Sequence, residues 1–426
     1  MMKHRLFRAF RGMALVLAVI LLCAACNIAA FTIDTPDMRR NAWQGSLMLR
    51  EQLGSPQTVG GFMSSQLDNF TAVLILKTAA YTGEESLLAK AAGGYRVDMP
   101  AEPGQSEWDA FCNYVSGPES PTGGGMCYAR YWHGYTLPLR LLLCVLDVAN
   151  LQMVLYFAQL ALLCLVLCMM KSRGLGLLIP GFFLSYFLLM PFSMSICLQY
   201  VPVSMLMLIA CVLILRWDED IARAVTLPAF FAVLGVLTNY LDLLTFPMVS
   251  LGFPLVLLLA LRMRRGEGGW SLFLLTALCG CSFALGYGGM WALKWIFTGL
   301  VFGWHSLWGI FTQITLRSSS NGGEISRIGV LMENLNVILA KKSYLLLIGL
   351  SGLLTLLPTA KALIKIRRMD LRALNLLLPA AAVAVWYLVM ANHSYDHTYF
   401  TYRNAAVMVF AGFAFIACLT KRGDLA

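Results

Sequence analysis

The sequence predicts an all-α polytopic membrane protein, with about ten transmembrane helices and a large first outer loop that contains short helices. Of its 426 residues, 59% are hydrophobic and only 13% are charged, and the mean hydropathy is +0.71. A soluble domain needs more charge than this to cover its surface. The apolar residues also come in blocks of roughly 17–25, the length that crosses a hydrocarbon core of about 30 Å.

The net charge of +10 does not indicate a nucleic-acid-binding protein. The basic residues lie in short clusters between apolar blocks, and there is no zinc-finger, RNP or basic-helix motif. A P-loop, a Gly-rich dinucleotide motif and HExxH are absent from the sequence as well. We therefore expect the lipid bilayer as a partner, and neither nucleic acid nor a nucleotide-driven reaction.

The first element, residues 1–31, is a basic N-terminus followed by an apolar run. Four basic residues between Lys3 and Arg11 precede the run from Met13 to Phe31, a pattern that resembles a signal peptide. Because nine further apolar spans follow, we interpret this run as an uncleaved first transmembrane helix. The residues behind it are then translocated to the outer side.

Residues 32–150 form a large outer loop with Gly/Pro-rich turns and short amphipathic helices such as Asn69–Ala80. Near its end, residues 136–149 carry an apolar stripe with helical spacing that Arg140 and Asp147 interrupt. This pattern favours a helix lying on the outer leaflet. The alternative is that these residues begin a long second span.

Cysteine usage is mostly that of a membrane protein rather than of a disulfide scaffold. Ten of the twelve cysteines lie in or beside apolar blocks, where Cys is a small buried hydrophobe. Only Cys112 and Cys127 lie in clearly polar sequence. A disulfide between these two fits an oxidising exterior.

Residues 151–426 carry the second to tenth spans, joined by short linkers. The spans fall near 151–170, 175–191, 196–215, 225–240, 247–261, 271–299, 343–360, 373–391 and 405–419. The linkers predicted on the cytoplasmic side are 171–174, 216–223, 262–267 and 361–372. With the N-terminus and residues 421–426, they hold 18 of the 32 Lys and Arg residues, as the positive-inside rule requires.

This alternation predicts that both termini are cytoplasmic and that later outer loops lie at 301–341 and 392–404. Lys294 is an exception inside an apolar run, and we expect its side chain to snorkel toward the outer surface.

Most acidic residues and histidines fall on the predicted outer side, namely 16 of 22 Asp and Glu and four of five His. A carboxylate there can take a proton from a hydroxyl, arginine can grip phosphate oxygens, and histidine can move a proton or bind a metal. His393 and His397, four residues apart, are a half-site for a metal. Each such side chain also has a structural alternative as a helix cap, a snorkelling group or part of the interfacial aromatic belt.

The layout resembles the GT-C class of integral membrane glycosyltransferases, which includes protein O-mannosyltransferases and the aminoarabinose transferase of lipid A. The likeness rests on a basic N-terminus, one span, an Asp that opens a large outer loop, and many later spans with short linkers. Three short motifs resemble those of bacterial members: Tyr131-Trp-His-Gly-Tyr135, Asp242-Leu-Leu-Thr-Phe-Pro247 and His397-Thr-Tyr-Phe-Thr-Tyr-Arg403. The family often places an acidic residue directly after its Asp, whereas this chain has Asp34-Thr-Pro-Asp37.

The resemblance implies transfer of a sugar from a polyprenyl-phosphate-linked donor to a glycan, lipid or protein acceptor. The reaction would take place on the outer face of a bacterial inner membrane. Asp34 or Asp37 would act as the base, and His133 and His397 would be catalytic residues that donate to the phosphate. The candidate substrate-binding residues are Asp68, Arg130, Tyr131, Trp132, Asp242, His393, Tyr402 and Arg403. No metal ligand is assigned, and the need for a divalent metal is left open.

Two other functions are consistent with the sequence. A lipid-linked glycan polymerase or ligase would also use outer arginines and histidines, here with Arg317, Glu324 and Arg327 in the late loop. A transporter or flippase of a lipid-linked substrate would place polar residues near the bilayer midplane and often contains internal repeats. The predicted spans are nearly uncharged at their centres, which favours the enzyme.

Overall fold

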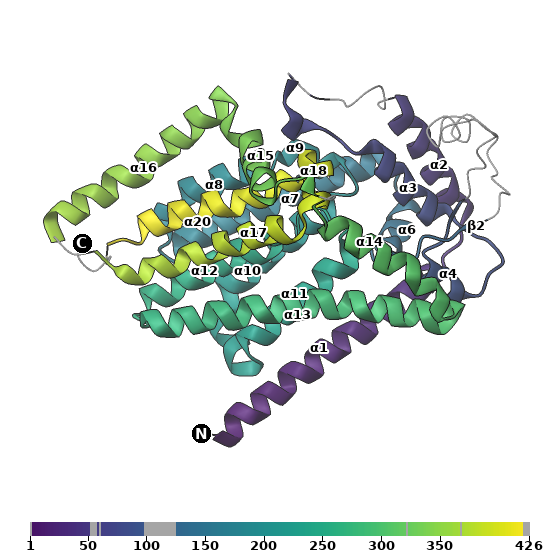
Figure 1. Cartoon of the computed structure of the whole chain (residues 1–426), viewed down its shortest axis with the longest axis horizontal. Helices are drawn as coiled ribbons and strands as arrows, with labels where there is room; N and C mark the ends of the chain where they lie inside the picture. Colours follow the sequence, from purple (N-terminus) through teal and green to yellow (C-terminus); the bar gives the residue numbers. More distant parts are fainter. Residues whose placement is uncertain are drawn as a thin grey trace.

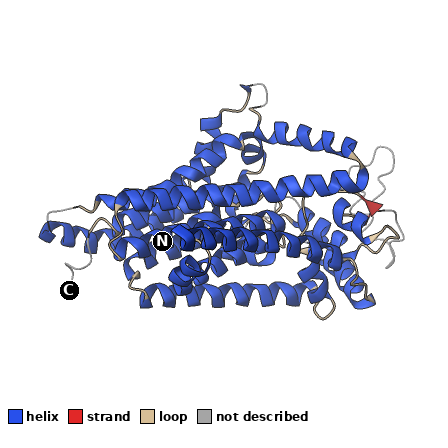
Figure 2. Ribbon diagram, turned by 90° about the horizontal axis from the view of Figure 1, so that it is seen from below, coloured by secondary structure: helices blue, strands red, loops and turns tan. Residues whose placement is uncertain are grey.

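The computed structural model of the chain describes residues 2–51, 58, 61–97, 125–320, 323–366 and 369–420. Within these residues the fold is almost entirely helical, as Figure 2 shows, and the predicted all-α class is confirmed. The one sheet among the described residues pairs β1 (Arg96–Val97) with β2 (Gly125–Met126) in antiparallel orientation. Cys112 lies outside the described residues, but Cys127 is a free thiol that donates to the Gly93 carbonyl at 3.4 Å, so the predicted disulfide between them is not formed in this structure.

The helices follow one another along the chain in three groups. The first group, up to the end of the large loop, is α1 (Met2–Ala30), α2 (Pro36–Glu51), η2 (Met63–Ser65), α3 (Asn69–Ala80), α4 (Leu87–Gly93) and α6 (Thr136–Leu143). The second group is α7 (Val148–Ser172), η3 (Gly176–Leu178), α8 (Ile179–Leu188), α9 (Pro191–Ile196), α10 (Val201–Ala224), α11 (Leu227–Leu241), α12 (Met248–Arg264) and α13 (Gly269–Phe302). The third group is η4 (Trp304–Leu307), α14 (Trp308–Ser318), α15 (Arg327–Leu339), α16 (Lys342–Ile366), η6 (Leu371–Leu377), α17 (Leu378–Val389), α18 (Ala391–Asp396), α19 (Thr398–Thr401), η7 (Tyr402–Asn404) and α20 (Ala405–Ala417).

The structure is that of a multi-pass membrane protein. Among the described residues, seven helical segments are long and apolar enough to cross a bilayer. These are Leu6–Ala30, Val148–Ser172, Val201–Ala224, Gly269–Phe302, Lys342–Ala362, Leu371–Val389 and Thr398–Ala417. Their outward faces are apolar, and Leu285 on α13 and Leu354 on α16 are 75% and 64% exposed. Surfaces of this kind are stable against lipid chains and not against water.

Close helix packing rests on glycine where backbones meet. A Cβ at Gly286 on α13 would lie 2.1 Å from the carbonyl oxygen of Ala232 on α11, and one at Gly235 would lie 2.2 Å from that of Phe283. Small residues of this kind let membrane helices approach without a gap. The α11–α13 pair then packs beside α12, whose residues 248–261 are buried on every face.

One end of the bundle, which we call the basic end, is defined by Asp218 and the arginines around it. Arg173 lies 3.0 Å and Arg262 3.4 Å from the Asp218 carboxylate, and Arg265 forms a third ion pair with it. These residues come from three linkers that the sequence predicts on one side of the membrane. The fourth such linker joins them, because Arg372 donates to the Glu267 carbonyl at 2.8 Å.

At the other end of the bundle, the helices of the large loop gather around α6, as Figure 1 shows. The helix α6 stops at Leu143, and Asp147 caps α7 separately, so a single long second span is ruled out. Arg140 is 1% exposed and donates to the carbonyls of Ala30 and Ile33. It therefore ties α6 to the end of α1 and does not lie at a lipid surface.

The position of Lys294 differs from the one expected from the sequence. Its side chain is fully buried and does not snorkel, because the Nζ atom donates to the carbonyls of Ala91 and Ala92 at 3.0 and 2.8 Å. Those carbonyls belong to the last turn of α4, where a helix lacks internal partners and carries partial negative charge. The ammonium thus anchors the large loop to α13, with the Trp132 ring 5.5 Å away.

Candidate functional site

A cavity of about 200 Å³ opens at the end opposite to the basic end, which we call the cavity end. Its walls come from α3, the loop before α6, α14 and the α18–α19 segment, which are distant in sequence. The polar lining residues are Asp68, Thr71, Thr78, Arg96, Tyr128, Tyr131, His133, Tyr135, Gln199, Arg317, His393 and His397. Phe70, Leu74, Ile75, Leu243 and Phe400 complete the lining.

The segment Tyr131–Tyr135, in the loop before α6, attaches this part of the cavity wall to the transmembrane helices. The Gly134 N–H donates to the Tyr240 carbonyl on α11 at 2.9 Å, and the Trp132 indole N–H donates to the Met290 carbonyl on α13 at 2.7 Å. His133 has a φ of 54°, a left-handed conformation that is unfavourable for a residue with a side chain. These contacts compensate for that strain and hold His133 and Tyr131 in the cavity wall.

The segment Asp242–Pro247 forms a tight turn that positions the part of the cavity wall contributed by α18. The Asp242 carboxylate accepts hydrogen bonds from the Thr245 N–H at 2.9 Å and from the Thr245 hydroxyl at 2.5 Å. Leu244, inside this turn, has a φ of 64°. Its carbonyl points to α18 and accepts a hydrogen bond from His393 Nε2 at 2.7 Å.

This bond determines the tautomer of His393. A carbonyl oxygen only accepts, so Nε2 carries the hydrogen and Nδ1 keeps its lone pair in the neutral ring. Nδ1 is buried and has no hydrogen-bond partner among the described residues, and the whole side chain is 3% exposed. A buried acceptor without a partner costs about 1–3 kcal/mol, which a bound ligand with a donor group would recover.

Arg317 supplies the opposite kind of group. It lies near the end of α14, and its guanidinium carbon is 5.7 Å from the centre of the Tyr131 ring. Its Nη1 atom is buried without a hydrogen-bond partner, and Arg317 forms no ion pair with any described residue. The guanidinium is therefore a charged donor available for an anion in the cavity.

Asp68 is the cavity's carboxylate. It caps α3 by accepting from the Thr71 N–H at 2.9 Å and also accepts from the hydroxyls of Thr71 and Tyr399, at 2.9 and 3.1 Å. All three donors are neutral, and within the described part of the chain Asp68 has no cationic partner at ion-pair distance. The cavity is therefore lined by the Asp68 carboxylate and by the Arg317 guanidinium, which form no ion pair with each other, and Arg96 also belongs to its lining.

Burial keeps the histidines around this cavity uncharged. The pKa of His393 lies well below its ordinary value because of burial, and the nearby Arg317 and His397 lower it further. Burial and Arg317 also lower the pKa of His397. For His133, burial and Lys294 lower the pKa to about 3. At neutral pH all three rings are thus hydrogen-bonding groups and not cations.

His133 is fully engaged in its neutral form. Its Nε2–H donates to the Tyr128 carbonyl at 3.0 Å, and its Nδ1 accepts from the Tyr135 hydroxyl at 2.7 Å. The ring of His397 packs against His393, with 4.8 Å between the ring centres. In the described part of the chain no group of three His, Cys, Asp or Glu side chains is close enough to hold a metal ion.

The cavity brings together five of the residues singled out in the sequence: Asp68, Tyr131, His133, His393 and His397. Arg130 lines a small adjoining pocket, which shares Tyr131 and Arg317 with the cavity. Trp132 and Asp242 lie in the loops that position the walls, as described above.

Arg403 and Tyr402 are placed behind the wall. The Arg403 guanidinium is fully buried and donates to the carbonyls of Leu189, Tyr399 and Ser64 at 2.9, 3.0 and 3.1 Å. The Tyr402 hydroxyl donates to the Ser64 carbonyl at 3.2 Å. Both side chains therefore join the α18–α20 region to η2 by contacts with backbone oxygens.

Asp34 and Asp37 lie outside the cavity wall, at the start of α2. Asp34 pairs with Arg39 at 2.8 Å and Asp37 pairs with Arg40 at 2.5 Å. All four side chains are between 45% and 56% exposed. In this structure both carboxylates are surface ion pairs with neighbours in sequence.

Arg96, Gln199 and Tyr399 were not singled out from the sequence, and Arg317 was noted only for the late loop. One local signal existed for Arg317, because it ends an amphipathic helix that carries aromatic residues at its start. The contact of α14 with α18, however, joins residues that are far apart in the chain.

Comparison with known proteins finds no family model, no curated protein and no solved structure that matches this chain. Fold and site therefore define a class only: a multi-pass helical membrane protein with a polar cavity at one end of its bundle.

Proposed function

We propose that the protein is a GT-C type membrane glycosyltransferase. It would transfer a sugar from a polyprenyl-phosphate-linked donor to a glycan, lipid or protein acceptor. The observation that carries this proposal is that one small cavity is lined by a carboxylate without a cationic partner, Asp68, and by a guanidinium without an anionic partner, Arg317, among the described residues. A substrate that brings both a hydroxyl proton and a phosphate would use both groups.

In this proposal α8, α11 and α12 also cross the bilayer, which makes ten spans with the seven long segments. Both termini would lie in the cytoplasm of a bacterium, and the cavity would open at the outer face of the inner membrane. The convergence of four Arg-bearing linkers at the basic end supports this orientation.

The reaction follows from the groups in the cavity. The acceptor hydroxyl would give its proton to the Asp68 carboxylate while its oxygen attacks the anomeric carbon of the donor sugar. The bond from that carbon to the phosphate oxygen breaks, and the polyprenyl phosphate leaves with the electron pair. Arg317 would stabilise the growing negative charge on the phosphate, and His393 Nδ1 would accept a hydrogen bond from a sugar hydroxyl.

The small pocket beside the cavity supports a ligand with a lipid chain. Trp291, Trp295 and Ile314 line it, and they continue from Arg317 along the facing surfaces of α13 and α14. A phosphate held by Arg317 could therefore keep its polyprenyl chain against apolar side chains.

One observation favours a second candidate, a lipid-linked glycan polymerase or ligase. Arg317 comes from the late segment 301–341, which is the segment on which that function depends. Such an enzyme would use a glycan on a lipid diphosphate in place of a single sugar on a lipid monophosphate. Competition between these two donor types for binding separates the candidates.

The test is ligand-induced stabilisation of the purified protein in nanodiscs. A short-chain polyprenyl phosphate at 100 times its dissociation constant should stabilise the wild type by about 2.7 kcal/mol. The Arg317→Gln variant should lose most of this stabilisation, because the phosphate loses its charged donor. The matched control is Lys342→Gln, which removes one exposed positive charge from the start of α16.

Two results would contradict the proposal. One is stabilisation by the free polyprenol equal to that by its phosphate, which would mean that the cavity recognises no anion. The other is an unchanged response in Arg317→Gln, which would place the phosphate elsewhere.

A further inference from the structure

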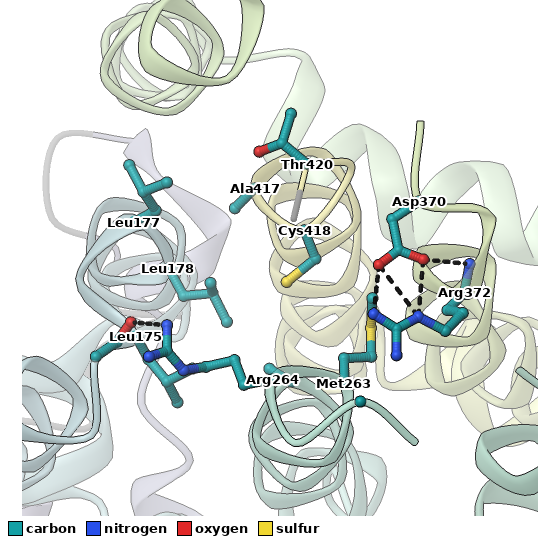
Figure 3. Close-up of a pocket in the computed structure, with 13 residues that line it drawn as sticks. Leu175, Leu177, Leu178, Met263, Arg264, Asp370, Arg372, Ala417, Cys418 and Thr420 are labelled. Carbon is teal, nitrogen blue, oxygen red and sulfur yellow. Dashed lines mark hydrogen bonds and ion pairs between the residues drawn. The ribbon is translucent and has the colours of Figure 1, made fainter. Parts of the chain in front are cut away.

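A second and larger pocket lies at the basic end of the bundle, with a volume of about 640 Å³. It is formed where α7 turns into η3, at the end of α12, at the start of η6 and at the end of α20. Figure 3 shows three leucines on one side, the Asp370–Arg372 pair on the other, and Arg264 below. The transferase proposal does not use this pocket.

The charges around the pocket do not cancel. The Arg372 side chain donates three hydrogen bonds to the Asp370 carboxylate, at 2.6, 2.9 and 3.1 Å, so the charges of these two residues balance. Arg264 is exposed to the pocket and donates one N–H to the Gly174 carbonyl at 2.8 Å. No ion pair joins Arg264 to a described residue, so one positive charge remains.

The contact between Arg264 and Gly174 depends on glycine. Gly174 has a φ of +72°, and a Cβ there would lie 2.6 Å from the Arg264 guanidinium. The turn after α7 thus leaves room for the guanidinium at the edge of the pocket.

A second polar group in the pocket also lacks a partner. The Thr420 hydroxyl is buried and makes no hydrogen bond with any described residue, and the side chain is 6% exposed. Buried hydroxyls are normally hydrogen-bonded, so this group indicates a ligand with an acceptor oxygen. A guanidinium at one edge of the pocket and a hydroxyl at the opposite edge suit a ligand that has a phosphate group and a further oxygen.

The rest of the wall is apolar. Leu175, Leu178 and Ala417 form it, and α20, which carries Ala417, packs beside α16. The helix α16 exposes leucines such as Leu353 and Leu357, at 53% and 57%. A soluble phosphate has no apolar part that could pack against this wall, whereas a phospholipid has acyl chains that can pack against it and extend along the lipid-exposed helix.

We propose that this pocket binds the headgroup of an anionic phospholipid, with its phosphate on Arg264, another oxygen of the headgroup on Thr420 at the opposite edge, and the start of an acyl chain against Leu175 and Leu178. Basic pockets between transmembrane helices are known to hold such headgroups. Because the pocket lies at the opposite end from the cavity, this proposal does not depend on the transferase activity.

The experiment compares lipids by thermal unfolding of the detergent-purified full chain. Dioleoylphosphatidylglycerol should raise the melting temperature, and dioleoylphosphatidylcholine should not. Arg264→Gln should weaken the apparent affinity for phosphatidylglycerol about fivefold, the factor for one arginine near a membrane surface. The matched control Arg223→Gln removes an exposed charge at the same end, outside the pocket, and should bind as the wild type does.

If Arg264→Gln does not fold, Thr420→Val takes its place, because it removes the hydroxyl and keeps the charge. It should weaken phosphatidylglycerol binding as well. The proposal is overturned if phosphatidylcholine stabilises equally or if the variants bind as the wild type does. Equal stabilisation by millimolar inorganic phosphate would also overturn it, because the site would then be one for soluble anions.

Discussion

The two ends of the bundle both contain charged side chains away from water, but they compensate these charges differently. At the basic end, Asp218 is 1% exposed and faces three arginines within 3.4 Å. At the cavity end, Asp68 is held by neutral donors, and Arg317 faces the ring of Tyr131.

This difference separates a structural cluster from a candidate binding site. Removing charge from water is expensive, so charges that only support the fold are paired with an opposite charge, as Asp218 is, or held by several carbonyls, as Arg403 is. Charges that remain without an ionic partner in a cavity lower the stability of the free protein, and a bound ligand of opposite charge can restore that stability. The left-handed residues His133 and Leu244 beside the cavity agree with this view, because strain tends to gather at functional sites.

The strongest test of the comparison is Asp68→Asn. The variant keeps the cap of α3, because asparagine caps helices as well as aspartate does, so stability should change by less than about 1 kcal/mol. Sugar transfer from a panel of polyprenyl-phosphate donors should fall by about 10²–10⁴, the usual contribution of a general base.

The control for this variant is Asp34→Asn, which removes an exposed ion pair worth about 0.2–1 kcal/mol at most. Transfer should be unaffected if Asp68 is the base. If Asp34→Asn abolishes transfer and Asp68→Asn does not, the base is the carboxylate that the family resemblance implies.

A smaller effect is expected at the basic end from Asp218→Asn. Loss of the carboxylate leaves three arginines without their shared partner, and breaking a buried pair costs about 3–5 kcal/mol. The arginine side chains here are 15–35% exposed, so water reduces the loss to about 2–3 kcal/mol. The melting temperature should fall, while binding of polyprenyl phosphate by the folded protein should be unchanged. A stable variant with impaired binding would reverse the assignment of the two ends.

The smallest expected effect is the pH dependence contributed by His133. Its pKa is about 3 in the folded protein and about 6.5 when unfolded, so the unfolded state binds more protons between these values. Stability should therefore fall as the pH drops below 6.5, by about 2 kcal/mol at pH 5 from this group. Burial raises the pKa of Asp242 to about 6, and this group acts in the opposite direction, gaining protons on folding between about pH 4 and 6.

The variant that isolates this contribution is His133→Asn, since asparagine tolerates the left-handed conformation. Melting temperatures at pH 7 and pH 5 should differ less in the variant than in the wild type. Asp242, His393 and His397 are present in both proteins and cancel in the comparison. An equal pH dependence would show that His133 is not kept neutral by its surroundings.

The sequence alone was sufficient for the class of fold and for the grouping of its linkers. The length of the apolar segments and the positions of the arginines between them can be read from the local sequence. In the structure Arg173, Asp218 and Arg262, from three of the predicted linkers, lie together at one end of the bundle. The sequence also drew attention to the segments that contain His133, Asp242 and His393, because His, Arg and Asp are concentrated in such short segments on the predicted outer side. Their tautomers and partners were not predictable, since each depends on a carbonyl in another segment.

Only the tertiary structure decided which of these residues share a cavity and which support it. Arg317 and Arg403 are both arginines in predicted outer loops, and the sequence does not distinguish them. In the structure, Arg317 has a nitrogen without a partner in the cavity, whereas Arg403 donates to three carbonyls. Lys294 was expected at a surface and is buried, because α4 turns its last carbonyls toward α13. The physical reason is the same in each case: local sequence determines which segments enter the membrane, whereas the partners of a buried polar group are determined by packing between distant segments.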